Sequence, residues 1–172
     1  KSFPASNPET NLSIRPNAHT RMPDFTVRRA TPDDAETLAR FNEAMAEETE
    51  DKTLDPDTVR AGVQAVFQKP EQAFYLVGER EETLVGALMI TTEWSDWRNA
   101  DFWWIQSVYV RPEARRTGVY TALHRDVRRR ARDAEGVCGL RLYVERGNAA
   151  AQAAYEELGM SEPPYRMYEE ML

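Results

Sequence analysis

Cysteine and histidine are scarce in this chain. Its 172 residues include one cysteine, Cys138, and two histidines. A single cysteine excludes an internal disulfide and a cysteine-rich metal site, and two histidines argue against a histidine-based one. We therefore expect no metal site. Cys138 precedes the apolar residues Leu140, Leu142 and Val144, a pattern that predicts a buried, small apolar side chain rather than a reactive thiol.

Long apolar runs are also missing. No window approaches the roughly 18 consecutive apolar residues of a membrane-spanning helix, and no arginine-led apolar core resembles a secretory signal. A cytoplasmic protein with no membrane partner is therefore expected. The apolar content of 41% suits a globular protein rather than a disordered one.

The charge of the chain is negative overall but unevenly distributed. A net charge of −7 argues against general nucleic-acid binding. Residues 33–82 contain 14 acidic and 5 basic side chains, whereas residues 111–146 contain 10 arginines and 5 acids. This asymmetry predicts a site for a polyanion in the second half, and it allows a cationic substrate to be attracted to the first half.

The order of expected elements defines the fold class. Residues 1–22 lack periodicity and predict an extended or disordered leader, with Met22 as a candidate start, so that one domain spans residues 23–172. Period-2 and helical-period patterns then alternate, which predicts an α/β fold with a mixed central sheet flanked by helices on both faces. Strands are expected over residues 25–29, 74–78, 84–92, 102–110, 138–144 and 165–171, and helices over 31–49, 55–69, 119–134 and 148–159.

A basic, glycine-containing loop follows the strand expected over residues 102–110. The first turn of a helix leaves its N–H donors unpaired, and the helix dipole adds positive charge there, so this junction favours an anion such as phosphate. Gly118 permits close approach of the backbone, and Arg115 and Arg116 supply cations. The Gly-x-x-x-x-Gly-Lys-Ser/Thr and Gly-x-Gly-x-x-Gly patterns are both absent, which argues against a nucleotide P-loop and a dinucleotide fold.

Two motifs in this order resemble those of the GNAT superfamily of acyl-CoA-dependent N-acyltransferases. Residues 108–120 resemble the family's strand and pyrophosphate loop, and residues 148–160 resemble its Asn-x-x-Ala-x-x-x-Tyr-x-x-x-Gly-Phe segment. The resemblance implies a GNAT-like single domain that uses acetyl-CoA. It also implies an acetyltransferase that catalyses direct attack of an amine on the thioester in a ternary complex.

The resemblance also assigns roles to residues. Tyr155 would be the general acid that protonates the thiolate, although a packed aromatic is the alternative. Tyr120 stands where the family usually has Gly or Ala, so its side chain must point away from the pyrophosphate or help to wall it. The implied cofactor-binding residues are Val108, Tyr109 and Val110 on the strand edge, Arg115, Arg116, Thr117, Gly118, Val119 and Tyr120 in the loop, and Asn148 and Tyr155.

The general base is not apparent from the sequence. Family members often carry a carboxylate near positions 106–107, where this chain has Gln106 and Ser107, neither of which is a useful base. Glu93, Asp96 and Glu145 are alternatives. We expect a water held by Gln106 and Ser107, with Glu93 or Asp96 nearby.

Acidic and aromatic residues suggest a cationic amine as substrate. Glu48 lies in the acidic segment 47–51, and Trp94, Asp96 and Trp97 lie in an expected loop over residues 93–99. Aromatic rings beside acids can bind a cation. The alternatives are a solvated acidic loop in the first case and a rigid, packed loop in the second.

Three functional hypotheses therefore differ in class. The first is an N-acetyltransferase acting on a small-molecule or peptide amine, and a homodimer is compatible with it. The second is a non-catalytic acyl-CoA-binding or sensing module, because the strand carboxylate is missing. The third uses the arginine-rich helix over 125–132 as a nucleic-acid or partner surface, against which the net charge argues.

Overall fold

The computed structural model describes residues 24–172. The leader expected over residues 1–22 lies outside this part. The five strands are β1 Thr26–Arg29, β2 Ala73–Arg80, β3 Thr83–Ser95, β4 Ala100–Val110 and β5 Val137–Leu142. The four α-helices are α1 Ala35–Glu50, α2 Pro56–Gln68, α3 Val119–Asp133 and α4 Ala149–Glu157, and two 3₁₀ turns span Pro32–Asp34 and Pro112–Ala114.

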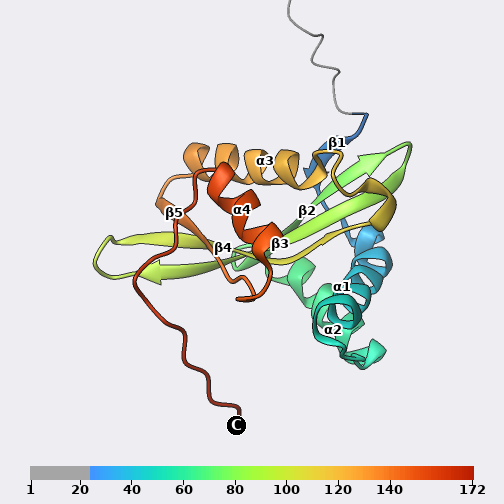
Figure 1. The fold of residues 1–172 in the computed structure, drawn as a ribbon, viewed down its shortest axis with the longest axis horizontal. Coiled ribbons are helices and arrows are strands. Elements are labelled where there is room, and N and C mark those ends of the chain that lie inside the picture. Colours follow the sequence, from blue (N-terminus) through green and yellow to red (C-terminus); the bar gives the residue numbers. More distant parts are fainter. Residues whose placement is uncertain (1–23) are drawn as a thin grey trace, which may run out of the picture.

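The strands form one mixed sheet in the order β1-β2-β3-β4-β5. The first four strands are antiparallel to their neighbours, and β5 runs parallel to β4 because α3 provides the crossover between them. Figure 1 shows α3 on one side of the sheet and α1 and α2 on the other. The α/β class and the helices on both faces are thus confirmed.

Two apolar cores explain why both faces are covered. Successive residues of β2 alternate between them: Leu76 belongs to the core under α3, whereas Tyr75 and Val77 belong to the core under α1 and α2. A strand with apolar residues on both faces must bury both. In α3, Val119, Leu123, Val127 and Ala131 form a buried stripe at helical spacing.

The helix starts follow the local sequence. Asp55 accepts a 2.8 Å hydrogen bond from the Thr58 N–H at the start of α2, and Pro56 occupies the first helical position. Ahead of α1, the Asp34 carboxylate accepts from the Thr31 N–H and from both terminal nitrogens of Arg28. Asp55 therefore caps the second helix, whereas the first begins as the 3₁₀ turn Pro32–Asp34 and becomes α-helical only at Ala35.

The central strand β4 contains a bulge. Ala87 and Met89 of β3 pair with Tyr109 and Gln106 of β4, so two steps along β3 correspond to three along β4. Ser107 lies at the extra position with a left-handed φ of 49°. A bulge bends the strand that carries it and increases its twist.

Gly86 of β3 lies in close contact with the neighbouring backbone and with α3. A Cβ at this position would lie 3.0 Å from the Tyr109 carbonyl oxygen and 2.9 Å from Val119 Cγ1. Any side chain here would push α3 away from the sheet.

Three local predictions were wrong. The loop expected over 93–99 is only the turn 96–99, because β3 extends to Ser95, and Glu93 and Trp94 are strand residues. Cys138 is exposed rather than buried, because β5 lies at the edge of the described sheet. No strand forms over 165–171: alternating apolar residues can form a strand only where a partner strand accepts their hydrogen bonds.

Two further observations concern the described residues. None of their helices is both long and apolar enough to cross a membrane. Within residues 24–172, no group of three or more His, Cys, Asp or Glu side chains is placed to hold a metal ion.

Candidate functional site

The loop between β4 and α3 presents a run of unpaired backbone donors. Arg116 and Gly118 both have left-handed φ, of 61° and 90°, and the Thr117 hydroxyl donates to the Ala114 carbonyl oxygen at 2.7 Å. Within the described part of the chain, the N–H groups of residues 116–121 donate to no backbone carbonyl. The Arg115 N–H is different, because it donates to the Pro112 carbonyl oxygen. Such a concave run of N–H groups at a helix N-terminus binds anions.

The two arginines of this loop have different surroundings. The Arg115 guanidinium donates to Glu48 Oε2 at 2.5 Å and to the Val110 carbonyl oxygen at 2.9 Å. Glu48 also accepts from the Tyr109 hydroxyl at 3.2 Å. Arg115 therefore offsets part of the negative charge at the C-terminal end of α1, where Lys52 also pairs with Glu50, and its contact with Glu48 ties α1 to the end of β4. Arg116 forms no ion pair among residues 24–172 and stays available to an anion.

The second half of β4 has one open edge. Pairing between β4 and β5 ends at Ile105 and Leu142, whereas pairing between β4 and β3 continues to Val110 and Gly86. Beyond the Ser107 bulge, β4 is thus without a neighbour on its β5 side in the described sheet. Main-chain groups on such an edge can bind an extended ligand as an added strand would. The predicted cofactor residues Val108, Tyr109 and Val110 lie on this segment.

The two sequence motifs meet through a pair of tyrosines. The rings of Tyr120 on α3 and Tyr155 on α4 lie edge to face, with centroids 5.6 Å apart. Tyr120 thus points toward α4, which resolves its departure from the family pattern. Burial raises the pKa of Tyr155 above its usual value, so the phenol keeps its proton at neutral pH. Asn148 begins α4, and its Oδ1 accepts from the Ala151 N–H at 3.0 Å.

Sequence reasoning missed His124, which lies beside this pair. Its ring centroid is 6.1 Å from that of Tyr120, and only 2% of its surface is exposed. The helical spacing could have revealed His124, because position 124 is one turn after Tyr120 and next to the buried Leu123.

The candidate base residues do not lie together. Glu93 accepts hydrogen bonds from Trp104 Nε1 at 2.6 Å and from Arg141 at 2.7 Å. Gln106 pairs with Met89, four residues from Glu93 along β3, which corresponds to about 13 Å. The Gln106 amide donates to Thr91 Oγ1 at 2.6 Å. The roles predicted for Glu93, Gln106 and Ser107 stay predictions.

The predicted substrate residues form two separate groups. Trp94 pairs with Asp101 of β4, and Trp97 is 87% exposed in the turn, where its N–H donates to Asp96. Glu48 instead contacts Tyr109, eight residues further along β4, which corresponds to about 26 Å. The structure therefore does not bring these residues into a single pocket.

The fold and this loop define an α/β protein with free N–H groups at a helix N-terminus next to an open strand edge. A family model described as acetyltransferase (GNAT) family matches residues 35–160. The chain belongs to this family, whose members use acetyl-CoA.

Solved structures share the fold. A possible acetyltransferase from Clostridium difficile 630 is 42% identical, with a TM-score of 0.81 over 86% of this chain and 97% of that one. A predicted acetyltransferase from Clostridium acetobutylicum, solved with acetyl-CoA, is 12% identical, with a TM-score of 0.71 over 85% and 96%. A ribosomal-protein-alanine N-acetyltransferase from Brucella melitensis biovar Abortus 2308 is 16% identical, with a TM-score of 0.70 over 86% and 99%. No curated protein gave a match.

Proposed function

We propose that this protein is an N-acetyltransferase that transfers the acetyl group of acetyl-CoA to a primary amine by direct attack. Acetyl-CoA supplies the thioester. The amine nitrogen forms a bond to the acetyl carbon, the carbon–sulfur bond breaks, and the sulfur leaves as a thiolate that takes up a proton. The ammonium form of the amine must lose its proton before the attack.

One observation carries this proposal: the unpaired N–H groups of residues 116–121 lie on the same helix end that contacts Tyr155. An anion-binding backbone and a protonated phenol, drawn from motifs about thirty residues apart in the sequence, are thereby adjacent. A pyrophosphate on the loop and a pantetheine chain along the open edge of β4 would use the backbone groups that the fold leaves free.

Each step then falls to particular groups. Tyr155 donates its phenolic proton to the leaving sulfur and regains a proton from solvent, which its raised pKa favours. A main-chain N–H near Val108 polarises the thioester carbonyl. A water bound near Gln106 and Ser107 relays the proton of the ammonium to bulk solvent, because neither side chain is itself a base.

A substitution of Glu93 tests whether this water, rather than a carboxylate, takes up the substrate proton. The Glu93 carboxylate is held by Trp104 and Arg141, so we propose that it does not accept the substrate proton. The Glu93→Gln variant should then retain the pH profile of kcat/KM. Loss of the acidic limb of that profile would make Glu93 the base instead.

The substrate is proposed to be a cationic primary amine, a small molecule or a peptide. Recognition by Trp94, Asp96 and Trp97 on the hairpin and recognition by Glu48 are separate proposals, because these groups are far apart. Glu48 would have to release Arg115 to bind an amine.

The decisive experiment combines turnover with binding. Purified protein is incubated with acetyl-CoA and a panel of polyamines, amino sugars and peptides, while thiol release and acetylated product are both measured; calorimetry with CoA is run in parallel. Amine-dependent turnover supports the proposal. CoA binding without turnover of any amine would favour an acyl-CoA-binding module, a reading that the absence of a carboxylate at Gln106 and Ser107 supports.

A further inference from the structure

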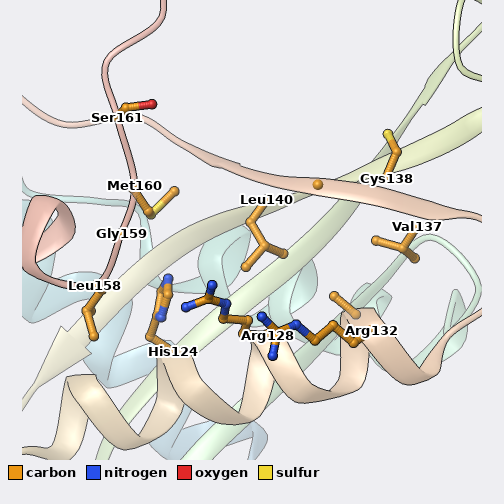
Figure 2. A pocket seen from close by; sticks show the side chains of 12 residues that line it. His124, Arg128, Arg132, Val137, Cys138, Leu140, Leu158, Gly159, Met160 and Ser161 are labelled. Atoms are coloured by element: carbon orange, nitrogen blue, oxygen red, sulfur yellow. The ribbon is translucent and has the colours of Figure 1, made fainter.

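A cavity lies beside residues 124–132 of α3, away from the loop at the start of this helix. It has a volume of about 430 Å³ and is enclosed by α3, β5 and the segment that follows α4. Figure 2 shows His124, Arg128 and Arg132 projecting from α3 toward the space below β5, with Leu158, Gly159 and Met160 along one side. The cavity is distinct from the 116–121 loop: Arg128 is ten residues after Gly118, which corresponds to about 15 Å along the helix.

His124 is a buried polar side chain that lacks a partner. It is 2% exposed, and neither ring nitrogen forms a hydrogen bond to any residue of the described chain. Buried polar groups are nearly always paired in folded proteins, so a group of this kind that lines a cavity is available to hydrogen-bond to a molecule bound there. Burial and the nearby Arg128 lower the pKa of His124, so the ring is neutral and offers one donor and one acceptor.

Two arginines on the same face of α3 also lack counter-ions. Arg128 and Arg132 are one and two turns beyond His124, and neither forms an ion pair among residues 24–172. Their neighbours are neutralised: Arg129 and Arg130 both bind Asp126, and Arg129 also reaches Asp133. No carboxylate lines the cavity. The face of α3 that looks into the cavity therefore carries two positive charges that no lining carboxylate balances.

The rest of the lining is mainly apolar. The apolar side chains of Leu140 on β5 and of Leu158 and Met160 after α4 are among the lining groups, together with Ser161. A simple inorganic anion would leave this apolar surface unused. An anionic group attached to an apolar body would contact both parts.

We propose that this cavity binds a small organic anion, in which a carboxylate or phosphate ester carries an apolar body. Arg128 and Arg132 bind the anionic group, His124 hydrogen-bonds to it, and Leu140 and Met160 contact the apolar body. This site does not depend on the proposed acetyl transfer. It contacts the candidate active site through His124 and Tyr120, which lie side by side.

Phenyl phosphate is a suitable probe, with inorganic phosphate for comparison. Binding to the full chain is measured by calorimetry, with CoA present at saturation so that the loop is occupied. NMR follows the ring resonances of the histidines. We expect saturable binding of phenyl phosphate at millimolar concentration or below, a shift of the His124 ring signal, and weaker binding of inorganic phosphate.

Three variants test the assignment. Arg128→Gln and Arg132→Gln should each weaken phenyl phosphate binding roughly tenfold, because each removes a charge-assisted hydrogen bond. Arg125→Gln is the matched control: Arg125 is an exposed arginine of the same helix that does not line the cavity. It should leave binding unchanged.

Several results would overturn the proposal. Absence of binding to the unmodified protein would remove the site. Unchanged binding by both Arg128→Gln and Arg132→Gln would place the probe elsewhere. Binding that disappears when CoA is added would make the cavity part of the cofactor site, and equal affinity for phosphate and phenyl phosphate would refute the apolar contribution.

Discussion

The two halves of β4 differ in how their hydrogen bonds are used. From Asp101 to Ile105 the strand is paired on both sides, with β3 and with β5. Beyond the bulge at Ser107 it is paired with β3 alone and leads into the 116–121 loop. The closed half carries side chains that bind those of the neighbouring strands, as Trp104 binds Glu93 of β3. The open half carries backbone groups without partners, and only such groups can bind a ligand without first breaking a contact.

This difference explains which predictions can be made from motifs. In the open half, function rests on main-chain donors, so a loop of the right shape suffices. In the closed half, function would rest on side chains, and their partners come from distant parts of the sequence. The four predictions below probe this contrast, from the largest expected effect to the smallest.

Removal of the Tyr155 hydroxyl should cause the largest loss. We expect Tyr155→Phe to reduce kcat by about 10² or more, the usual contribution of a positioned general acid, with little change in the Kd for CoA. Because the pKa of Tyr155 is raised, loss of activity from its deprotonation should begin only above its usual value of about 10. Steady-state kinetics across pH and calorimetry provide the measurements.

Tyr168→Phe is the matched control for Tyr155, because Tyr168 is 89% exposed after α4. It should retain full kcat. A Tyr155→Phe enzyme with normal kcat would assign Tyr155 to packing and leave the open half of β4 with a binding role alone.

A side chain at Gly118 should weaken the loop. Its φ of 90° is left-handed, a conformation that costs an L-residue about 1–2 kcal/mol. Gly118→Ala should therefore lower the affinity for CoA by roughly tenfold, because the N–H groups lose their arrangement. A Cβ here would meet no atom within 4 Å, so the effect is conformational rather than steric.

Gly62→Ala is the matched control, because it adds a Cβ at a glycine whose backbone is not left-handed. Gly62 lies inside α2, with open space around it and no left-handed φ. This variant should raise the free energy of unfolding by about 0.5–1 kcal/mol and leave CoA affinity unchanged. Equal CoA affinity in Gly118→Ala and the unmodified protein would show that the loop does not hold the cofactor.

The link between α1 and the open half should contribute modestly to stability. Glu48→Gln removes the charge that binds Arg115, and we expect the free energy of unfolding to fall by about 0.2–1 kcal/mol, because the pair is partly exposed. The difference should shrink at high salt. Denaturant titration at low and high salt measures it, with Glu47→Gln as an unpaired neighbour. A salt-independent loss would indicate packing rather than charge.

Removal of the Tyr120 hydroxyl should have the smallest effect. This oxygen is buried and has no partner among the described residues, and removing an unpaired buried polar group costs little or is stabilising. Tyr120→Phe should keep the ring contact with Tyr155, so kcat and Tm should be nearly unchanged. Tyr109→Phe is the contrast, since its hydroxyl binds Glu48 and its loss should lower Tm. A marked drop in kcat for Tyr120→Phe would show that the hydroxyl takes part in the chemistry.

Local patterns in the sequence determined the order of most elements, the capped helix starts at Asp55 and Asn148, the two buried faces and the glycine-containing loop with free N–H groups. Each depends on residues close in the chain, or on periods of 2 and 3.6 that record burial directly. Tertiary structure alone decided the bulge at Ser107 and the edge-to-face contact of Tyr120 with Tyr155. It also decided the ion pair between Glu48 and Arg115 and the exposure of Cys138. These depend on which strand lies beside which and on where side chains from distant segments meet. A backbone motif can therefore be read from its own residues, whereas the partners of a side chain cannot.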